Sequence, residues 1–129
     1  MTEPVWIDER DVLALHNRLL ALEGGAPGIH DAGLLNSALA RPRQLFAYGE
    51  SPDIVDMAAA YVAGIVRNHG FLDGNKRTGF VVGVLFLEIN DCRFVASEED
   101  ATQAVLALAA GKLDECALTA WLGANVKFR

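Results

Sequence analysis

Apolar residues recur at helical spacing near the start of the chain. An amphipathic helix is predicted over residues 8–22 because four apolar residues lie three or four positions apart: Val12, Leu15, Leu19 and Leu22. Acidic residues at the start of this segment favour the positive end of a helix dipole. The sequence "EGGAPG" (23–28) ends the helix, since glycine and proline interrupt regular structure.

A second helix is predicted to start after Asp31, which is a good N-cap residue, and to run to about Ala40. Pro42 is expected to end it, because a proline disfavours helical geometry in the residue before it. The next stretch, "RPRQLFAYGE" (41–50), has no regular period. We interpret it as a loop or flap.

Two long apolar segments follow. Ser51 and Pro52 predict a helix start that continues to about Asn68, with apolar residues on nearly every face. Another helix is predicted from Gly74 or Asn75 to Asn90, again apolar almost all round. A helix without a polar face is typical of a buried position, so these two helices are expected at the centre of the fold.

The C-terminal part predicts a short extended link at 91–95 and two more helices. "SEED" (97–100) resembles a capping box and begins a helix to about Ala110, and a last helix covers roughly Asp114–Val126. No internal repeat or domain linker is evident. The expected fold is all-α: one compact domain spanning residues 1–129, a bundle of about six helices with a polar turn between the two central ones.

Composition narrows the class of protein. The chain has 129 residues, of which 52% are hydrophobic, and a formal net charge of −6. This acidity argues against direct binding to nucleic acid or to anionic membranes, both of which need cationic surfaces. Apolar runs of about ten residues are too short to span a bilayer.

The N-terminus lacks the basic and then apolar layout of a signal peptide. Cys92 and Cys116 are isolated from one another and from histidines. A disulfide remains possible, but two such thiols fit a reducing compartment better. A cytoplasmic location is therefore expected.

The polar turn between the two apolar helices reads "HGFLDGNKRTGF" (69–80). The first backbone N–H groups of the following helix have no intrahelical partner, so its N-terminus predicts an anion site. Gly74 allows a phosphate to approach the backbone, Lys76 and Arg77 add positive charge, and Asn75 can hydrogen-bond a ligand. These residues indicate a phosphate-binding cradle.

Two further motif residues suggest chemistry. Asp73 is an acid beside an anion site, which makes sense if it holds Mg²⁺ shared with phosphate oxygens. His69 is placed to act as a general base that takes a proton from an attacking hydroxyl. A base, a metal ligand and a phosphate cradle together point to phosphoryl or nucleotidyl transfer.

Other aromatic and histidine residues are interpreted as structural. His16 and His30 are expected to be satisfied polar residues, with His16 partly buried on the first helix. Phe71 is expected to anchor the turn in the core. Trp6 and Trp121 are expected in the core or at its rim.

The sequence "HGFLDGNKRTG" resembles the signature of the Fic superfamily, and specifically its Doc (death-on-curing) branch, in eight residues: His69, Phe71, Asp73, Gly74, Asn75, Lys76, Arg77 and Thr78. The stretch 13–42 is also similar to the N-terminal part of Doc toxins. The resemblance implies a small helical toxin in which His69 is the base, Asp73 binds Mg²⁺, and residues 74–77 hold the phosphates of ATP or another nucleoside triphosphate. Arg67 is a weaker site candidate.

The chain departs from the AMP-transferring Fic members at two positions. Lys76 replaces a glycine, and Phe80 stands where those members have a second arginine. In Doc-like proteins the lysine accompanies a nucleotide that presents its γ-phosphate, which implies phosphorylation. The implied target is a threonine of translation elongation factor Tu. AMP transfer and an inactive nucleotide-binding or partner-binding module remain the alternatives.

The resemblance also implies control by a separate antitoxin of the Phd type. Self-restrained Fic proteins share a helix reading (Ser/Thr)-x-x-x-Glu-(Gly/Asn), and no such segment occurs here. A helical antitoxin segment is expected to lie in a groove among the first helix, the second helix and residues 41–50. The anchors and cations predicted there are Leu45, Phe46, Tyr48, Arg41 and Arg43.

Overall fold

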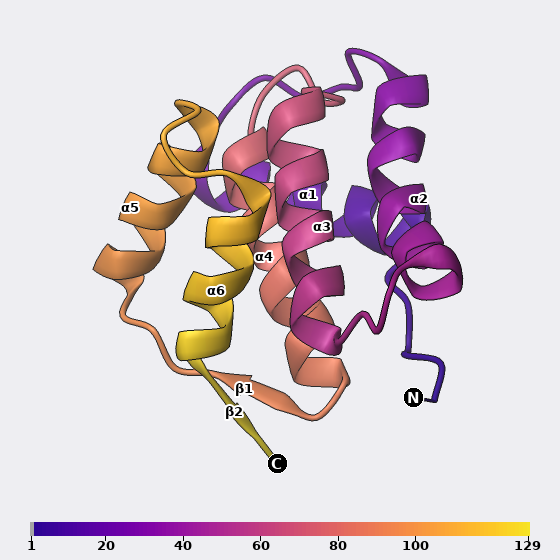
Figure 1. Cartoon of the computed structure of the whole chain (residues 1–129). Helices are drawn as coiled ribbons and strands as arrows, with labels where there is room; N and C mark the ends of the chain where they lie inside the picture. The colour runs from indigo at the N-terminus through magenta and orange to yellow at the C-terminus, as the bar shows by residue number, and fades with distance from the viewer. Residues whose placement is uncertain (1) are drawn as a thin grey trace.

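Helix α3 (Ile54–Asn68) lies at the centre of the molecule, and every residue from Met57 to Val66 is buried. In the computed structural model, which describes residues 2–129, α3 contacts α2 (Ala32–Tyr48), α4 (Asn75–Ile89) and α6 (Glu115–Ala124). The described residues also form α1 (Glu9–Glu23), α5 (Glu98–Ala109) and a ribbon of β1 (Cys92–Phe94) and β2 (Val126–Phe128). Figure 1 shows α5 and α6 on one side of α3 and α2 on the other. The prediction of an all-α fold of about six helices, two of them central, is confirmed, with the short ribbon as an addition.

Four of the described helices, α1, α2, α3 and α6, start after an aspartate N-cap. The side chain of Asp8 accepts from the N–H of Asp11, and Asp31 caps α2 as predicted. The predicted start of α3 at Ser51 is wrong by two residues, because Asp53 is the N-cap and exchanges hydrogen bonds with Asp56. Such a reciprocal pair satisfies two exposed backbone donors, which a lone serine cannot do.

Only half of the capping box predicted at 97–100 forms. The hydroxyl of Ser97 accepts from the N–H of Asp100, and α5 follows. The side chain of Asp100 does not return a bond to Ser97 within this described stretch.

The expected loop at 41–50 is wrong, because α2 continues through Pro42 to Tyr48. Proline removes one backbone bond and disfavours a helix interior. Tertiary contacts outweigh this penalty: Pro42 is buried, and the half-buried Phe46 packs against the core. Arg41 forms two hydrogen bonds to the carboxylate of Glu115 at 2.6 and 3.0 Å, which fixes this turn against α6.

The last helix is shorter than predicted. It ends at Ala124, and β2 pairs antiparallel with β1 so that Arg93 lies opposite Lys127. The extended link predicted at 91–95 is confirmed as a strand, but its partner strand was not predicted. A three-residue strand carries no usable alternation, so its pairing depends on the fold bringing the two segments together.

α4 packs closely on α3 at two glycines, Gly79 and Gly83. A Cβ atom added to Gly83 would lie 2.3 Å from Cγ2 of Val62, and one added to Gly79 would lie 2.9 Å from Cγ2 of Val66. α4 is buried along one face, whereas Val81 and Val84 are half-buried. α4 is therefore a central helix, as predicted, with one partly exposed edge. The turn between α3 and α4 lies at the end of this rigid pair, at the top of Figure 1.

Candidate active site

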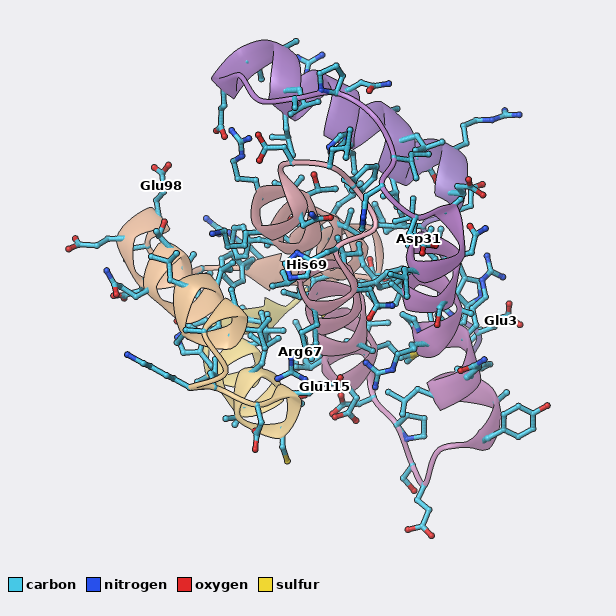
Figure 2. All side chains as sticks on the ribbon, turned by 90° about the horizontal axis from the view of Figure 1, so that it is seen from above. Glu3, Asp31, Arg67, His69, Glu98 and Glu115 are labelled. Carbon is cyan, nitrogen blue, oxygen red and sulfur yellow. The ribbon has the colours of Figure 1, made fainter. Side chains whose placement is uncertain are left out.

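The turn joining α3 to α4 is bounded by two residues in the left-handed conformation. His69 ends α3 with φ 51°, and Gly74 precedes α4 with φ 80°. A non-glycine residue in this region is uncommon and is often found where structure serves a function. The side chain of His69 is exposed. Figure 2 looks down on this end of the molecule and shows His69 near the centre, with Asp31 and Glu98 on opposite sides.

Two side chains fix the interior of the turn. Phe71 is 2% exposed, which confirms that it anchors the turn in the core. The amide of Asn75 accepts from the N–H of Phe71 and donates to its carbonyl, both at 3.0 Å. Asn75 is thus buried and engaged with the protein itself. Its predicted bond to a ligand stays a prediction, and the structure adds a role in closing the turn.

The carboxylate of Asp73 is exposed and held by backbone N–H groups. Oδ2 accepts from Ala26 at 3.2 Å and Oδ1 accepts from Gly74 at 2.8 Å. These two bonds, helped by the positive charge of Arg77, keep the pKa of the Asp73 carboxyl below its usual range. The carboxylate is therefore oriented and negatively charged before any ligand binds.

The donor set fits a shared magnesium ion better than a closed metal site. Within residues 2–129, no three His, Cys, Asp or Glu side chains cluster closely enough to hold a metal ion. Mg²⁺ commonly binds one or two carboxylates, substrate phosphates and water. Asp73 keeps free lone pairs on both oxygens, so it could supply the protein ligand of a metal–nucleotide complex.

The two motif cations differ in their surroundings. Arg77 donates to Glu23 at 2.6 Å and to the carbonyl of Gly24 at 3.1 Å, both at the end of α1. Lys76 is exposed and makes no ion pair within the described residues. Gly74 provides no side-chain cap to α4, so the first N–H groups of this helix face no capping oxygen from it. A charged lysine and uncapped N–H groups together favour an anion.

A cavity of about 410 Å³ lies beside these cations, between α1, α4 and α5. Glu23, Lys76, Arg77 and Glu98 form its polar part. Its apolar wall consists of residues from all three helices: Leu19, Phe80, Val81, Ala101, Val105 and Leu106. A pocket of this size with an apolar wall and a few charged groups is typical of a small-molecule site.

The segment 24–31 lies along the motif turn. Ile29 forms an isolated antiparallel bridge with Phe71, and the N–H groups of His30 and Asp31 both donate to the carbonyl of Gly70. The irregular segment beside the motif is therefore 24–31, part of which the sequence predicted only as the end of the first helix. The three positive-φ glycines in "GGAPG" are the signal that could have indicated a shaped loop here: Gly24, Gly25 and Gly28.

The structure also places the remaining candidates. His16 is almost fully buried rather than partly buried, and its contact is with the motif, because Nε2 lies 2.7 Å from the carbonyl oxygen of Asp73. His30 is exposed, with Nδ1 3.4 Å from the carbonyl of His69. Arg67 donates to the carbonyl of Leu113 near α6, away from the motif contacts. Thr78 is fully buried, so it belongs to the core.

Other predictions concern the rest of the molecule. Trp6 and Trp121 are half-buried against the core, as expected. Both cysteines are free thiols, with Cys92 buried and Cys116 exposed. Among residues 2–129, no helix has the length and apolar character needed to cross a bilayer.

Comparison with known proteins identifies the family of this chain. The sequence model described as "Fic/DOC family" matches residues 6–87, which include α1, the segment 24–31 and the whole motif. The chain is 34% identical over 93 residues to "Protein kinase doc" of Escherichia phage P1, covering 72% of this chain and 74% of the relative. It is 40% identical over 98 residues to "Toxin Doc" of Mycolicibacterium smegmatis, covering 74% of this chain and 71% of the relative. The predicted resemblance to Doc toxins is confirmed, and the chain belongs to the Fic/DOC family.

Proposed function

We propose that this protein is the toxin of a type II toxin–antitoxin system and acts as a protein kinase. The proposed reaction transfers the γ-phosphate of ATP, or of another nucleoside triphosphate, to a threonine hydroxyl of elongation factor Tu. The observation that carries the proposal is Lys76, an unpaired cation in the first turn of α4 beside the uncapped helix N-terminus. The name of the phage P1 relative, a protein kinase, supports it.

The chain's residues suit an in-line transfer. In the proposed reaction His69 accepts the proton of the threonine hydroxyl while that oxygen forms a bond to the γ-phosphorus. The bond from the γ-phosphorus to the bridging oxygen breaks, and the nucleoside diphosphate leaves. Lys76, Arg77 and the first N–H groups of α4 would balance negative charge on the phosphates. When bound, Mg²⁺ would neutralise phosphate charge, and Asp73 would hold it.

The wall of the cavity is consistent with this reaction. Phe80 stands where AMP-transferring relatives are expected to have a second arginine, and its ring packs edge-on against Phe94 with centroids 5.6 Å apart. An aromatic ring at this position cannot pair with an α-phosphate as a guanidinium can. Loss of that contact favours the γ-phosphate as the transferred group.

The decisive experiment uses labelled ATP. Purified protein is incubated with elongation factor Tu, Mg²⁺ and ATP labelled at either the γ- or the α-phosphate, and His69→Asn serves as the inactive control. Label on the target from γ-ATP alone supports phosphorylation. Label from α-ATP identifies an AMP transferase, and no label with either donor supports an inactive binding module. Mass spectrometry of the target then identifies the modified residue.

We further propose that a separate Phd-type antitoxin restrains the protein in the cytoplasm. The candidate surface on α2 includes Tyr48, whose side chain is 88% exposed. Leu45 and Phe46 are half-buried, and Phe46 packs edge-on against Trp6 at 5.8 Å. An exposed tyrosine beside a half-buried apolar pair is a reasonable anchor for an amphipathic helix.

The trans-restraint proposal is tested by co-expression with the adjacent gene and affinity capture. Tyr48→Asp is a better probe of the surface than Phe46→Asp, because Phe46 contributes to the core and its loss would also affect folding. Failure to obtain either a complex or rescue of growth contradicts restraint in trans. A normal complex with Tyr48→Asp contradicts only the position of the surface.

A further inference from the structure

His16 lies on the inner face of α1, far from the motif in sequence but in direct contact with it. The side chain is 2% exposed, and Nε2 lies 2.7 Å from the carbonyl oxygen of Asp73. Its ring stacks on Phe71, with centroids 3.7 Å apart and planes inclined by 9°. A carbonyl oxygen only accepts hydrogen bonds, so Nε2 must carry the proton in this contact.

This contact fixes more than one atom. The carbonyl of Asp73 and the N–H of Gly74 belong to the same planar peptide group and point in opposite directions. The N–H side of that group donates to Oδ1 of Asp73 at 2.8 Å. By holding the carbonyl, His16 also sets the direction of the N–H that orients the Asp73 carboxylate.

The peptide needs an external restraint because glycine follows it. Gly74 has φ 80° and, lacking a Cβ atom, can adopt other conformations in which the preceding peptide plane is rotated. The neighbouring contacts hold other parts of the turn: Asn75 holds Phe71, and Ala26 holds the carboxylate of Asp73. Among the described residues, His16 supplies the side-chain contact to the carbonyl of this peptide.

We propose that His16 is a positioning residue of the active site. It sets the plane of the Asp73–Gly74 peptide, and through it the direction of the Asp73 carboxylate and the start of α4. The catalytic part of this inference rests on the proposed function, whereas the control of loop conformation does not. A histidine that merely filled space in the core would not need a protonated Nε2 aimed at this carbonyl.

Two variants separate the ring from its N–H group. His16→Phe keeps the aromatic stack on Phe71 and the buried volume but removes the donor. His16→Gln keeps an N–H donor and loses the stack. Tyr61→Phe is the matched control, because the buried Tyr61 hydroxyl forms its hydrogen bonds with the backbone of Ile7 and not with the motif. It too loses a buried hydrogen bond.

The first measurement is amide hydrogen exchange in the protein without nucleotide, together with its global stability. His16→Phe is expected to speed amide exchange at Gly74 and Phe71 by about tenfold or more beyond the increase that its loss of global stability alone would cause, because the turn opens locally. His16→Gln should retain most of the protection, and Tyr61→Phe should leave these two amides unchanged. Two-bond ¹⁵N–¹H NMR spectra of the wild type should show a proton on Nε2 of His16.

The second measurement is phosphate transfer. His16→Phe is expected to lower kcat by about 10–100-fold, the size of effect caused by misplacing a catalytic group by about 1 Å. His16→Gln should recover much of this rate, and Tyr61→Phe should match the wild type. If His16→Phe does not fold, exchange in His16→Gln and the NMR spectrum still test the contact.

The outcomes distinguish the two proposals. If the wild type transfers no phosphate but His16→Phe loosens Gly74 selectively, the proposed function fails and the positioning role stands. If His16→Phe and Tyr61→Phe give the same exchange at Gly74 and Phe71, or Nε2 carries no proton, the positioning role is wrong.

Discussion

Both polar atoms of the Asn75 side-chain amide form hydrogen bonds with the backbone of one residue, Phe71. Oδ1 accepts from the Phe71 N–H and Nδ2 donates to the Phe71 carbonyl, each at 3.0 Å. The motif turn is therefore closed by hydrogen bonds within the motif itself, because Asn75, the first residue of α4, holds the backbone of the buried Phe71. His69 and Asp73 lie on either side of that fixed point.

Asn75→Asp tests this closure with a nearly isosteric change. It replaces the donor Nδ2 by an oxygen facing the Phe71 carbonyl in a buried position, so the free energy of unfolding should fall by about 1–3 kcal/mol. Transfer should fall with it, since the turn loosens. Denaturant unfolding and the labelled-ATP assay measure the two effects.

Asn125→Asp is the matched control for Asn75→Asp. Asn125 donates to the carbonyl of Trp121 at the end of α6, away from the motif. Its variant should keep wild-type transfer. Loss of transfer in the control as large as in Asn75→Asp would mean that the assay reports general destabilisation.

His69→Asn should abolish transfer and preserve the fold. The exposed His69 side chain contributes little to the core, and asparagine tolerates the left-handed backbone at φ 51° better than alanine does. Loss of a general base typically costs about 10²–10⁴-fold in rate. Circular dichroism checks the fold, and growth arrest on induction gives a cellular measure. A folded variant that arrests growth like the wild type would falsify the role of His69.

Asp73→Asn should separate charge from hydrogen bonding. The asparagine oxygen can still accept from one backbone N–H, so the melting temperature should change little, whereas metal binding loses its carboxylate. Transfer should fall by about 10²-fold, the typical cost of losing one group that stabilises developing charge. Excess chelator should have the same effect on the wild type. Full activity under chelation would exclude a divalent metal.

The Asp73 carboxyl should titrate below the ordinary aspartate value of 3.8. A lowered pKa means that folding favours the charged form, so this contribution is complete above the unfolded pKa and is lost as pH falls through the folded one. Contact with residue 26 should weaken only in that acidic window. The chemical shift of the carboxyl carbon reports the midpoint, and a midpoint at or above 3.8 would contradict the two N–H bonds seen here.

Glu23→Gln should strengthen nucleotide binding. The Glu23 carboxylate lies 2.6 Å from Arg77 and neutralises a cation beside the phosphate cradle. Both side chains are partly exposed, so the pair is worth no more than about 1 kcal/mol, which corresponds to an affinity gain of up to about fivefold. Calorimetry at low and high salt measures the gain, which should shrink as salt rises.

Glu115→Gln provides the comparison for Glu23→Gln. It removes a similar partner from Arg41, between α2 and α6. Nucleotide affinity should not change. Equal gains in both variants would indicate an effect of net charge rather than release of Arg77.

The helices were predictable where local signals and burial agree. Asp31 caps α2 as expected, and the apolar sequence of α3 corresponds to a helix that is buried from Met57 to Val66. The motif was predictable as a turn between α3 and α4 because its polar residues interrupt two apolar runs. The similarity to known Doc proteins then confirmed the family.

The errors arise where tertiary contacts decide the outcome. Pro42 ends a helix in isolation, but here its turn is held by the core and by the Arg41–Glu115 pair. The contact of His16 with Asp73 joins residues 57 positions apart in the sequence, and no local sequence pattern can predict a contact between such distant positions. Likewise, the amides of Ala26 and Asn75 gain their roles from how the segment 24–31 and the turn fold against one another.

Two glycines of α4 that contact α3, Gly79 and Gly83, affect how this protein could be evolved in the laboratory. Gly79 and Gly83 let α4 approach the side chains of Val62 and Val66 on α3 closely, so the position of the motif relative to α3 depends on the absence of side chains at these two glycines. Libraries that keep these glycines can therefore vary the cavity wall at Phe80 and Val81 while retaining the close packing of α4 on α3 below the motif turn. A larger residue at either glycine would press on Val62 or Val66, so these side chains or α4 would have to move, and selection for new donors would be confounded with changes at the site.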